Sequence, residues 1–108
     1  MNTELIASLR QQCGGSRDGA LLRFSLGNAL LADGDAHAAI DELRRAVAFD
    51  PTYSAAWKLL GKACLDAGQT QAAADAWRSG VAAAVQRGDK QAEKEMGVFL
   101  RRLEKTAP

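Results

Sequence analysis

The sequence predicts an all-α protein built from six short helices. Alanine, leucine and long charged residues dominate its 108 residues, whereas there are only two prolines and few β-branched residues, a composition that favours helix over strand. Glycine, proline and N-capping residues interrupt the apolar periodicity at intervals of one helix length. Part of the chain also repeats with a period of 34 residues, and such self-similarity is typical of stacked helical units.

The interruptions separate the predicted helices in order along the chain. They lie at Gly14-Gly15, Gly34-Asp35, Asp50-Pro51, Gly68-Gln69-Thr70 and Gly88-Asp89. The predicted helices span residues 3–13, 19–33, 36–49, 53–67, 70–86 and 89–105.

The first and last of these helices carry an apolar stripe along one side. The stripes consist of Leu5, Ile6, Leu9 and Cys13 in the first helix, and of Ala92, Met96, Phe99, Leu100 and Leu103 in the last. Helical spacing of apolar residues indicates a face that packs against a neighbour. We therefore predict that both helices cover the ends of a stack, the last one mainly as a solvated cap rather than as a partner-binding arm.

The four middle helices form two copies of one unit. Residues 20–53 align with residues 54–87, and 11 of the 34 pairs are identical. The copies share a glycine inside the first helix, Gly27 and Gly61, where glycine costs about 1 kcal/mol relative to alanine. A close helix approach explains this cost, and we predict that Ala73 meets Gly61.

Two tryptophans, Trp57 and Trp77, lie on the first and second helices of the second copy. Aromatic residues at helical spacing are usually part of the core. We therefore predict that both tryptophans are buried, rather than serving as binding platforms.

This pattern resembles the tetratricopeptide repeat family, whose unit is a 34-residue antiparallel helix pair. The matching positions are Trp57, Leu60-Gly61, Ala73 and Trp77 in the second unit, and Leu26-Gly27, Ala39, Leu43, Ala46 and Pro51 in the first. The resemblance implies a single-domain superhelix over residues 1–108, with an N-terminal helix (3–13), two repeats (20–53 and 54–87) and a capping helix (89–105). Arg23 replaces the first tryptophan, and Val85 replaces the second proline, which lets the last repeat helix run longer.

No catalytic, cofactor-binding or metal-binding residues are predicted. His37 is the only histidine, which excludes a two-histidine metal site within one chain, and it lies beside the turn at Gly34-Asp35, so we predict no Ser-His-Asp triad either. The loop at residues 14–19 contains no lysine followed by serine or threonine, which a phosphate-binding loop requires. Asp41 and Glu42 lie among basic residues and are predicted to be solvated. Cys13 and Cys64 are predicted to be free thiols.

The resemblance places function on the concave wall, which the first helix of each unit forms. The predicted groove residues are Phe24, Asn28, Leu31, Lys58, Lys62 and Leu65. Lys58 and Lys62 are four residues apart, which is mildly unfavourable for a helix; they are either ordinary surface lysines or part of a binding site. Members of the family that clamp a C-terminal carboxylate use a pattern that only Asn28 matches here, so that clamp is not predicted.

These observations predict a non-catalytic protein–protein interaction module that binds a peptide or helix, with acidic groups, in its concave groove. The first alternative is a structural role in which the end helices drive homo-oligomer formation. Nucleic-acid binding through residues 86–108 is disfavoured, because six basic side chains there face four acidic ones. The net charge of +1 gives no general attraction to nucleic acid or membrane. Without an evident signal peptide or membrane span, a cytoplasmic location is expected.

Overall fold

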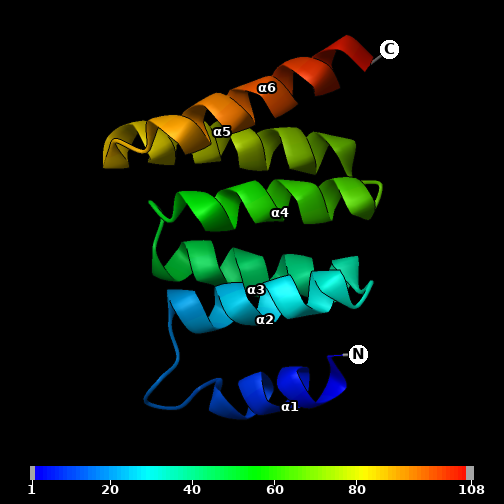
Figure 1. Ribbon diagram of the computed structural model, residues 1–108, viewed down its shortest axis with the longest axis vertical. Helices are drawn as coiled ribbons and strands as arrows, with labels where there is room; N and C mark the ends of the chain where they lie inside the picture. Colours follow the sequence, from blue (N-terminus) through cyan, green and yellow to red (C-terminus); the bar gives the residue numbers. More distant parts are fainter. Residues whose placement is uncertain (1, 107–108) are drawn as a thin grey trace.

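The computed structural model describes residues 2–106, and in that part of the chain it contains six helices and no strand (Figure 1). Each helix begins and ends within one residue of its predicted bounds, and the predicted all-α class is confirmed. The helices are α1 (Thr3–Gln12), α2 (Ala20–Ala32), α3 (Ala36–Phe49), α4 (Ser54–Asp66), α5 (Thr70–Arg87) and α6 (Lys90–Thr106).

The helices stack in chain order, from α1 at one end to α6 at the other (Figure 1). Helices α2 and α3 form one antiparallel pair and α4 and α5 the next, while α3 packs against α4 and α5 against α6. Helix α4 also contacts both α2 and α6. The helices α2, α4 and α6 therefore form one side of the stack, which we call the concave side, and α3 and α5 form the opposite, convex side.

The helix ends follow from local chemistry. Gly34 and Gly68 occupy equivalent places after α2 and α4, with φ of +86° and +78°, a backbone conformation that favours glycine. Helix α5 is four residues longer than α3, 18 against 14, as expected where Val85 stands in place of a proline. No helix in residues 2–106 is long and apolar enough to span a membrane.

The repeated glycines lie against large side chains of the second helix of each pair. A Cβ built on Gly61 would overlap the indole of Trp77, whose Nε1 donates a hydrogen bond to the carbonyl oxygen of Lys58 at 3.1 Å. A Cβ on Gly27 would likewise lie 2.6 Å from Leu43 Cγ, one repeat earlier. The three atoms nearest to the Gly61 Cβ position all belong to Trp77, one turn beyond Ala73 along α5, so the predicted contact between Ala73 and Gly61 stays a prediction. At Gly27 the nearest atoms also include the carbonyl oxygen of Ala39, the equivalent of Ala73, at 3.4 Å.

Trp77 is buried as predicted, whereas Trp57 is only half-buried. A Cβ on Gly80 of α5 would overlap Met96 of α6 and the Cβ of Trp57, so the stem of Trp57 packs closely while its ring extends toward the surface. The ring Nε1 donates to the carbonyl oxygen of Pro51 at 2.8 Å. The prediction of two core tryptophans is therefore wrong for Trp57.

Glu42 is buried, with 6% of its surface exposed, although the sequence predicted a solvated side chain. Its carboxylate accepts a hydrogen bond from Arg23 Nη1 at 2.8 Å and one from Arg45 Nη1 at 3.2 Å, and Arg10 Nη1 lies 3.9 Å away. Burial of a carboxylate requires such partners. Position 42 faces inward between α1 and α3, and the arginines compensate the charge of the buried carboxylate.

Arg23, which replaces a tryptophan of the repeat pattern, also fixes the loop between α1 and α2. It donates two hydrogen bonds to Asp18, from Nε at 2.8 Å and from Nη2 at 2.7 Å. Asp18 in turn accepts hydrogen bonds from the backbone nitrogens of Gly14 and Gly19. One arginine thus connects this loop to α3 through Glu42.

The Asp18 contacts predict a pH dependence of stability. Hydrogen bonds from Arg23 and from the backbone hold the pKa of Asp18 well below its ordinary value of 3.8. A carboxylate whose pKa is lowered by folding contributes stability that is present above its unfolded pKa and is lost as the pH falls toward its folded pKa. We therefore measure the melting temperature as a function of pH. Below pH 3.8, we expect it to fall less steeply with decreasing pH in Asp18→Asn than in the wild type. The exposed Asp33→Asn is the control, and equal slopes for all three proteins would contradict the assignment.

Candidate partner-binding surfaces

The predicted groove residues of α2 lie near the first end of the concave side. Phe24 is half-buried, and its ring packs on Tyr53 with the centroids 5.1 Å apart; burial raises the pKa of that tyrosine. Phe24 and the exposed Asn28 line a hollow between α1 and α2. Leu31, also half-buried, packs against the hydrophobic core.

The two predicted groove lysines of α4 have different surroundings. Lys58 is half-buried, and its Nζ forms an ion pair with Glu95 Oε1 of α6 at 3.1 Å. Lys62 has a side chain that is 63% exposed, and its nearest carboxylate oxygen is Asp66 Oδ2, 3.9 Å away on the same helix. The charge of Lys58 is therefore compensated across two helices, whereas Lys62 presents its charge to solvent.

Leu65 lies at an apolar hollow between α4 and α6, with 42% of its surface exposed. The hollow has a volume of about 320 Å³, and its other walls come from Trp77, Phe99, Arg102, Leu103 and Thr106. The rings of Trp77 and Phe99 are 5.2 Å apart. We call this space the α4–α6 hollow.

The six predicted residues are thus distributed along the concave side and do not converge in one cavity. Phe24 and Asn28 share the hollow at α1, Leu65 lines the α4–α6 hollow, and Lys58 lines a separate small depression with Glu95. The contribution of α6 was not predicted from the sequence, in which the last helix reads as a cap. The apolar stripe of α6, which includes Phe99 and Leu103, was the signal that could have identified it.

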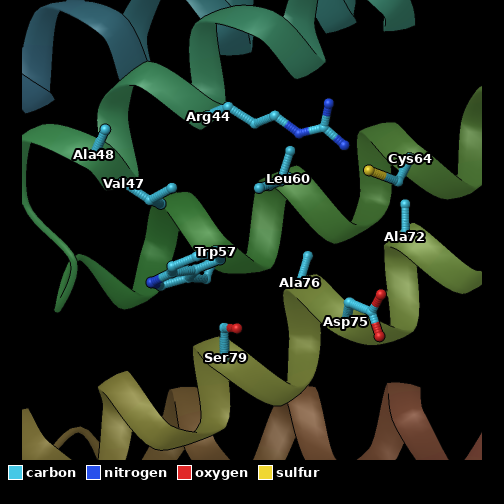
Figure 2. Close-up of a pocket in the computed structure, with 10 residues that line it drawn as sticks. All are labelled: Arg44, Val47, Ala48, Trp57, Leu60, Cys64, Ala72, Asp75, Ala76 and Ser79. Atoms are coloured by element: carbon cyan, nitrogen blue, oxygen red, sulfur yellow. The ribbon is translucent and has the colours of Figure 1, made fainter.

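A second hollow that the sequence did not predict lies on the convex side, between α3 and α5 with α4 as its floor (Figure 2). Its volume is about 420 Å³. Trp57 forms one end, Leu60 lies in the floor, and Arg44 extends from α3 above that floor (Figure 2). The complete lining is Arg44, Val47, Ala48, Trp57, Leu60, Cys64, Ala72, Asp75, Ala76 and Ser79. We call it the convex hollow.

Neither hollow contains the side chains of a metal site or an activated nucleophile. Within residues 2–106 no three His, Cys, Asp or Glu side chains are grouped so that they could hold a metal ion. Cys64 in the convex hollow is buried, and burial raises the pKa of its thiol, which favours the unreactive protonated form. The chemistry that these surfaces offer is apolar contact together with arginine and lysine charges.

Comparison with known proteins agrees with the stacked pairs and their repeated glycines. Two tetratricopeptide repeat models match the chain, one over residues 30–92 and the other over residues 4–54. The chain belongs to the tetratricopeptide repeat family.

Relatives of this tetratricopeptide repeat protein cover nearly its whole length. It is 52% identical over 101 residues to the TPR repeat-containing protein PA0015 of Pseudomonas aeruginosa, a match that covers 94% of this chain and 96% of the relative. The solution structure of protein BPP2914 from Bordetella parapertussis shares 46% identity with a TM-score of 0.79, over 97% of this chain and 89% of that one.

A more distant solved structure shares the fold. The Sgt2 TPR domain of Aspergillus fumigatus superposes with a TM-score of 0.74 at 21% identity, over 98% of this chain and 72% of that one. Tetratricopeptide repeats serve in general as protein–protein interaction modules, and proteins of the family are generally non-catalytic. The general role of this tetratricopeptide repeat protein is therefore protein–protein interaction.

Proposed function

We propose that the protein binds an extended or helical segment of a partner protein on its concave side, centred on the α4–α6 hollow. The observation that carries this proposal is the exposure of Leu65 beside a hollow whose walls are Trp77, Phe99 and Leu103. An exposed apolar hollow edged by charged residues is a feature of interaction sites. Covering one leucine or phenylalanine side chain of the partner would contribute about 1.5–3 kcal/mol.

The charges around the hollow favour an acidic partner segment. Lys62 lies one helical turn before Leu65, and Arg102 of α6 lines the hollow itself. Arg102 forms no ion pair with any residue between 2 and 106. A carboxylate beside the inserted apolar side chain would therefore meet Arg102 on α6 and, on α4, the exposed Lys62, whose ion-pair contact with Asp66 is long at 3.9 Å. Lys58 contributes less, because Glu95 already compensates its charge.

The remaining predicted groove residues extend the proposed site along α2. Phe24 and Leu31 provide half-buried apolar surface, and the exposed Asn28 provides an amide that can donate and accept hydrogen bonds. A segment that continues from the α4–α6 hollow toward α1 would pass these residues. We propose that they orient the segment, while the hollow provides most of the affinity.

Charge reversal at Lys62 tests this proposal. A partner is first isolated by affinity capture with the intact chain, and its affinity is then measured by titration calorimetry. We expect Lys62→Glu to weaken binding about tenfold, since a favourable charge contact becomes a repulsive one. Leu65→Ser is expected to weaken binding further, because it removes the apolar contact at the edge of the hollow.

The matched control is Lys94→Glu, which makes the same charge change at an exposed position of α6 beside a depression that α5 shares. It should bind the partner as the wild type does. Circular dichroism of all three variants establishes that the helices are intact. A partner that binds Lys62→Glu and Leu65→Ser with unchanged affinity would move the site away from the concave side.

A further inference from the structure

The convex hollow has a counterpart one repeat earlier in the same chain. Shifting its lining by 34 residues places Arg10 at the position of Arg44, and Glu42 at the position of Ala76. The same shift matches Arg23 to Trp57. The site equivalent to the convex hollow therefore lies one repeat earlier, between α1 and α3 with α2 as its floor. The two sites can be compared residue by residue.

The earlier site is closed by a carboxylate of the chain itself. Glu42 lies there with 6% of its surface exposed; it accepts hydrogen bonds from Arg23 at 2.8 Å and from Arg45 at 3.2 Å, while Arg10 lies 3.9 Å away. Helix α3 thus supplies an acidic side chain to the space between itself and its neighbours. The arginine at the wall, Arg10, faces a negative charge from within the protein.

The convex hollow keeps the wall arginine, Arg44, but lacks the carboxylate; Trp57 and Ser79 also replace the two arginines that hydrogen-bond that carboxylate one repeat earlier. Ala76 stands in place of the glutamate, so a space of about 420 Å³ remains. Arg44 forms no ion pair within residues 2–106. The other charged group of the lining, Asp75, is already engaged by Arg78 at 3.2 Å and by the amide of Gln71 at 3.0 Å. Figure 2 shows Arg44 extended above the floor, with Asp75 on the opposite wall.

We propose that the convex hollow binds an acidic side chain of a partner protein, whose carboxylate pairs with Arg44, the counterpart of the Arg10 that lies 3.9 Å from Glu42 one repeat earlier. An apolar neighbour of that acidic residue would lie against the half-buried Trp57, above Leu60 in the floor. Charge-assisted hydrogen bonds to a guanidinium are the strong class of polar contact, and a tryptophan face adds a large apolar area at low entropic cost. This site lies on the opposite side from the α4–α6 hollow and does not depend on the function proposed there.

Selection from a peptide library tests the proposal without a known partner. The probe is a phage-displayed library of short random peptides with a fixed central residue, which is glutamate in one half of the library and glutamine in the other. On the wild-type protein we expect the glutamate half to be enriched. The enriched peptides should bind Arg44→Gln at least about tenfold more weakly, as expected when a charged hydrogen-bond partner is lost.

Two further variants separate this site from others. Ala76→Glu restores the carboxylate of the earlier repeat and should also abolish binding; Arg44→Glu, at an exposed position, gives the same test if the first variant folds poorly. Lys62→Glu changes the concave side alone and should bind the peptides unchanged. Equal enrichment of the two library halves, or peptides that bind Arg44→Gln and Arg44→Glu as they bind the wild type, would overturn the proposal.

Discussion

Replacing Trp77 with alanine is expected to lower the free energy of unfolding by about 3–5 kcal/mol, the usual cost of removing a buried tryptophan. The indole is 4% exposed, covers Gly61, packs on Phe99 and donates a hydrogen bond to the Lys58 carbonyl oxygen. Its removal would leave a cavity at the centre of the α4–α5 pair and would unsettle the wall of the α4–α6 hollow. Urea unfolding followed by circular dichroism measures the effect.

A double-mutant cycle with Gly61→Ala tests whether glycine is required at position 61 because a larger residue would clash with the Trp77 indole. In the wild type we expect Gly61→Ala to destabilise the protein by about 1–3 kcal/mol, because its Cβ has no room beside Trp77. In the Trp77→Ala background the same change should be neutral or stabilising, since alanine is the better helix former by about 1 kcal/mol. Equal effects of Gly61→Ala in both backgrounds would contradict the packing explanation.

Removing Arg23 is expected to have the second largest effect, a loss of about 3 kcal/mol. The Arg23→Ala variant leaves the buried carboxylate of Glu42 with only Arg45 at 3.2 Å and Arg10 at 3.9 Å. It also removes the two hydrogen bonds that hold Asp18. Urea unfolding at neutral pH measures the change.

Two comparisons identify the buried charge as the cause. In the Arg23→Ala background, Glu42→Ala should restore much of the stability, because it removes the unpaired carboxylate and reproduces the alanine found at the equivalent position of the second repeat. Arg45→Ala, whose side chain is 53% exposed, should cost less than about 1 kcal/mol. If Glu42→Ala lowered the stability of the Arg23→Ala variant further, the carboxylate would not be the source of the loss.

The sequence was sufficient to predict the helices and their order, because glycines and capping residues mark the helix ends and the 34-residue period marks the repeated unit. It did not determine which side chain covers each glycine. Periodicity placed Ala73 and Trp77 on the same inward face of α5, but the length of the indole decided that Trp77 reaches Gly61. Glu42 was misjudged from its charged neighbours, although the repeat aligns it with Ala76, and the burial of both residues shows that this position faces inward.

The candidate sites were less predictable, since they depend on contacts between helices of different units. The groove residues Lys58 and Lys62 look equivalent along α4, and only the placement of Glu95 on α6 distinguishes them. Helix α6 lies outside the two aligned repeats, so their alignment gives no register for it against α4. Aromatic residues at helical spacing are usually buried, which placed Trp57 in the predicted core, and the convex hollow that its ring borders was missed as a result.

Because each helix stacks mainly on its neighbours in the chain, the fold should form rapidly. Most contacts join segments that are close in sequence, so little loop entropy is lost before they form, and topologies of this kind fold rapidly. The α4–α5 pair closes across a short turn and contains the Trp77 contact, which makes it a natural place for folding to begin. Helix α1 has no buried residue and packs mainly on α2. It therefore gains least from docking and is the part of the stack that detaches at lowest cost.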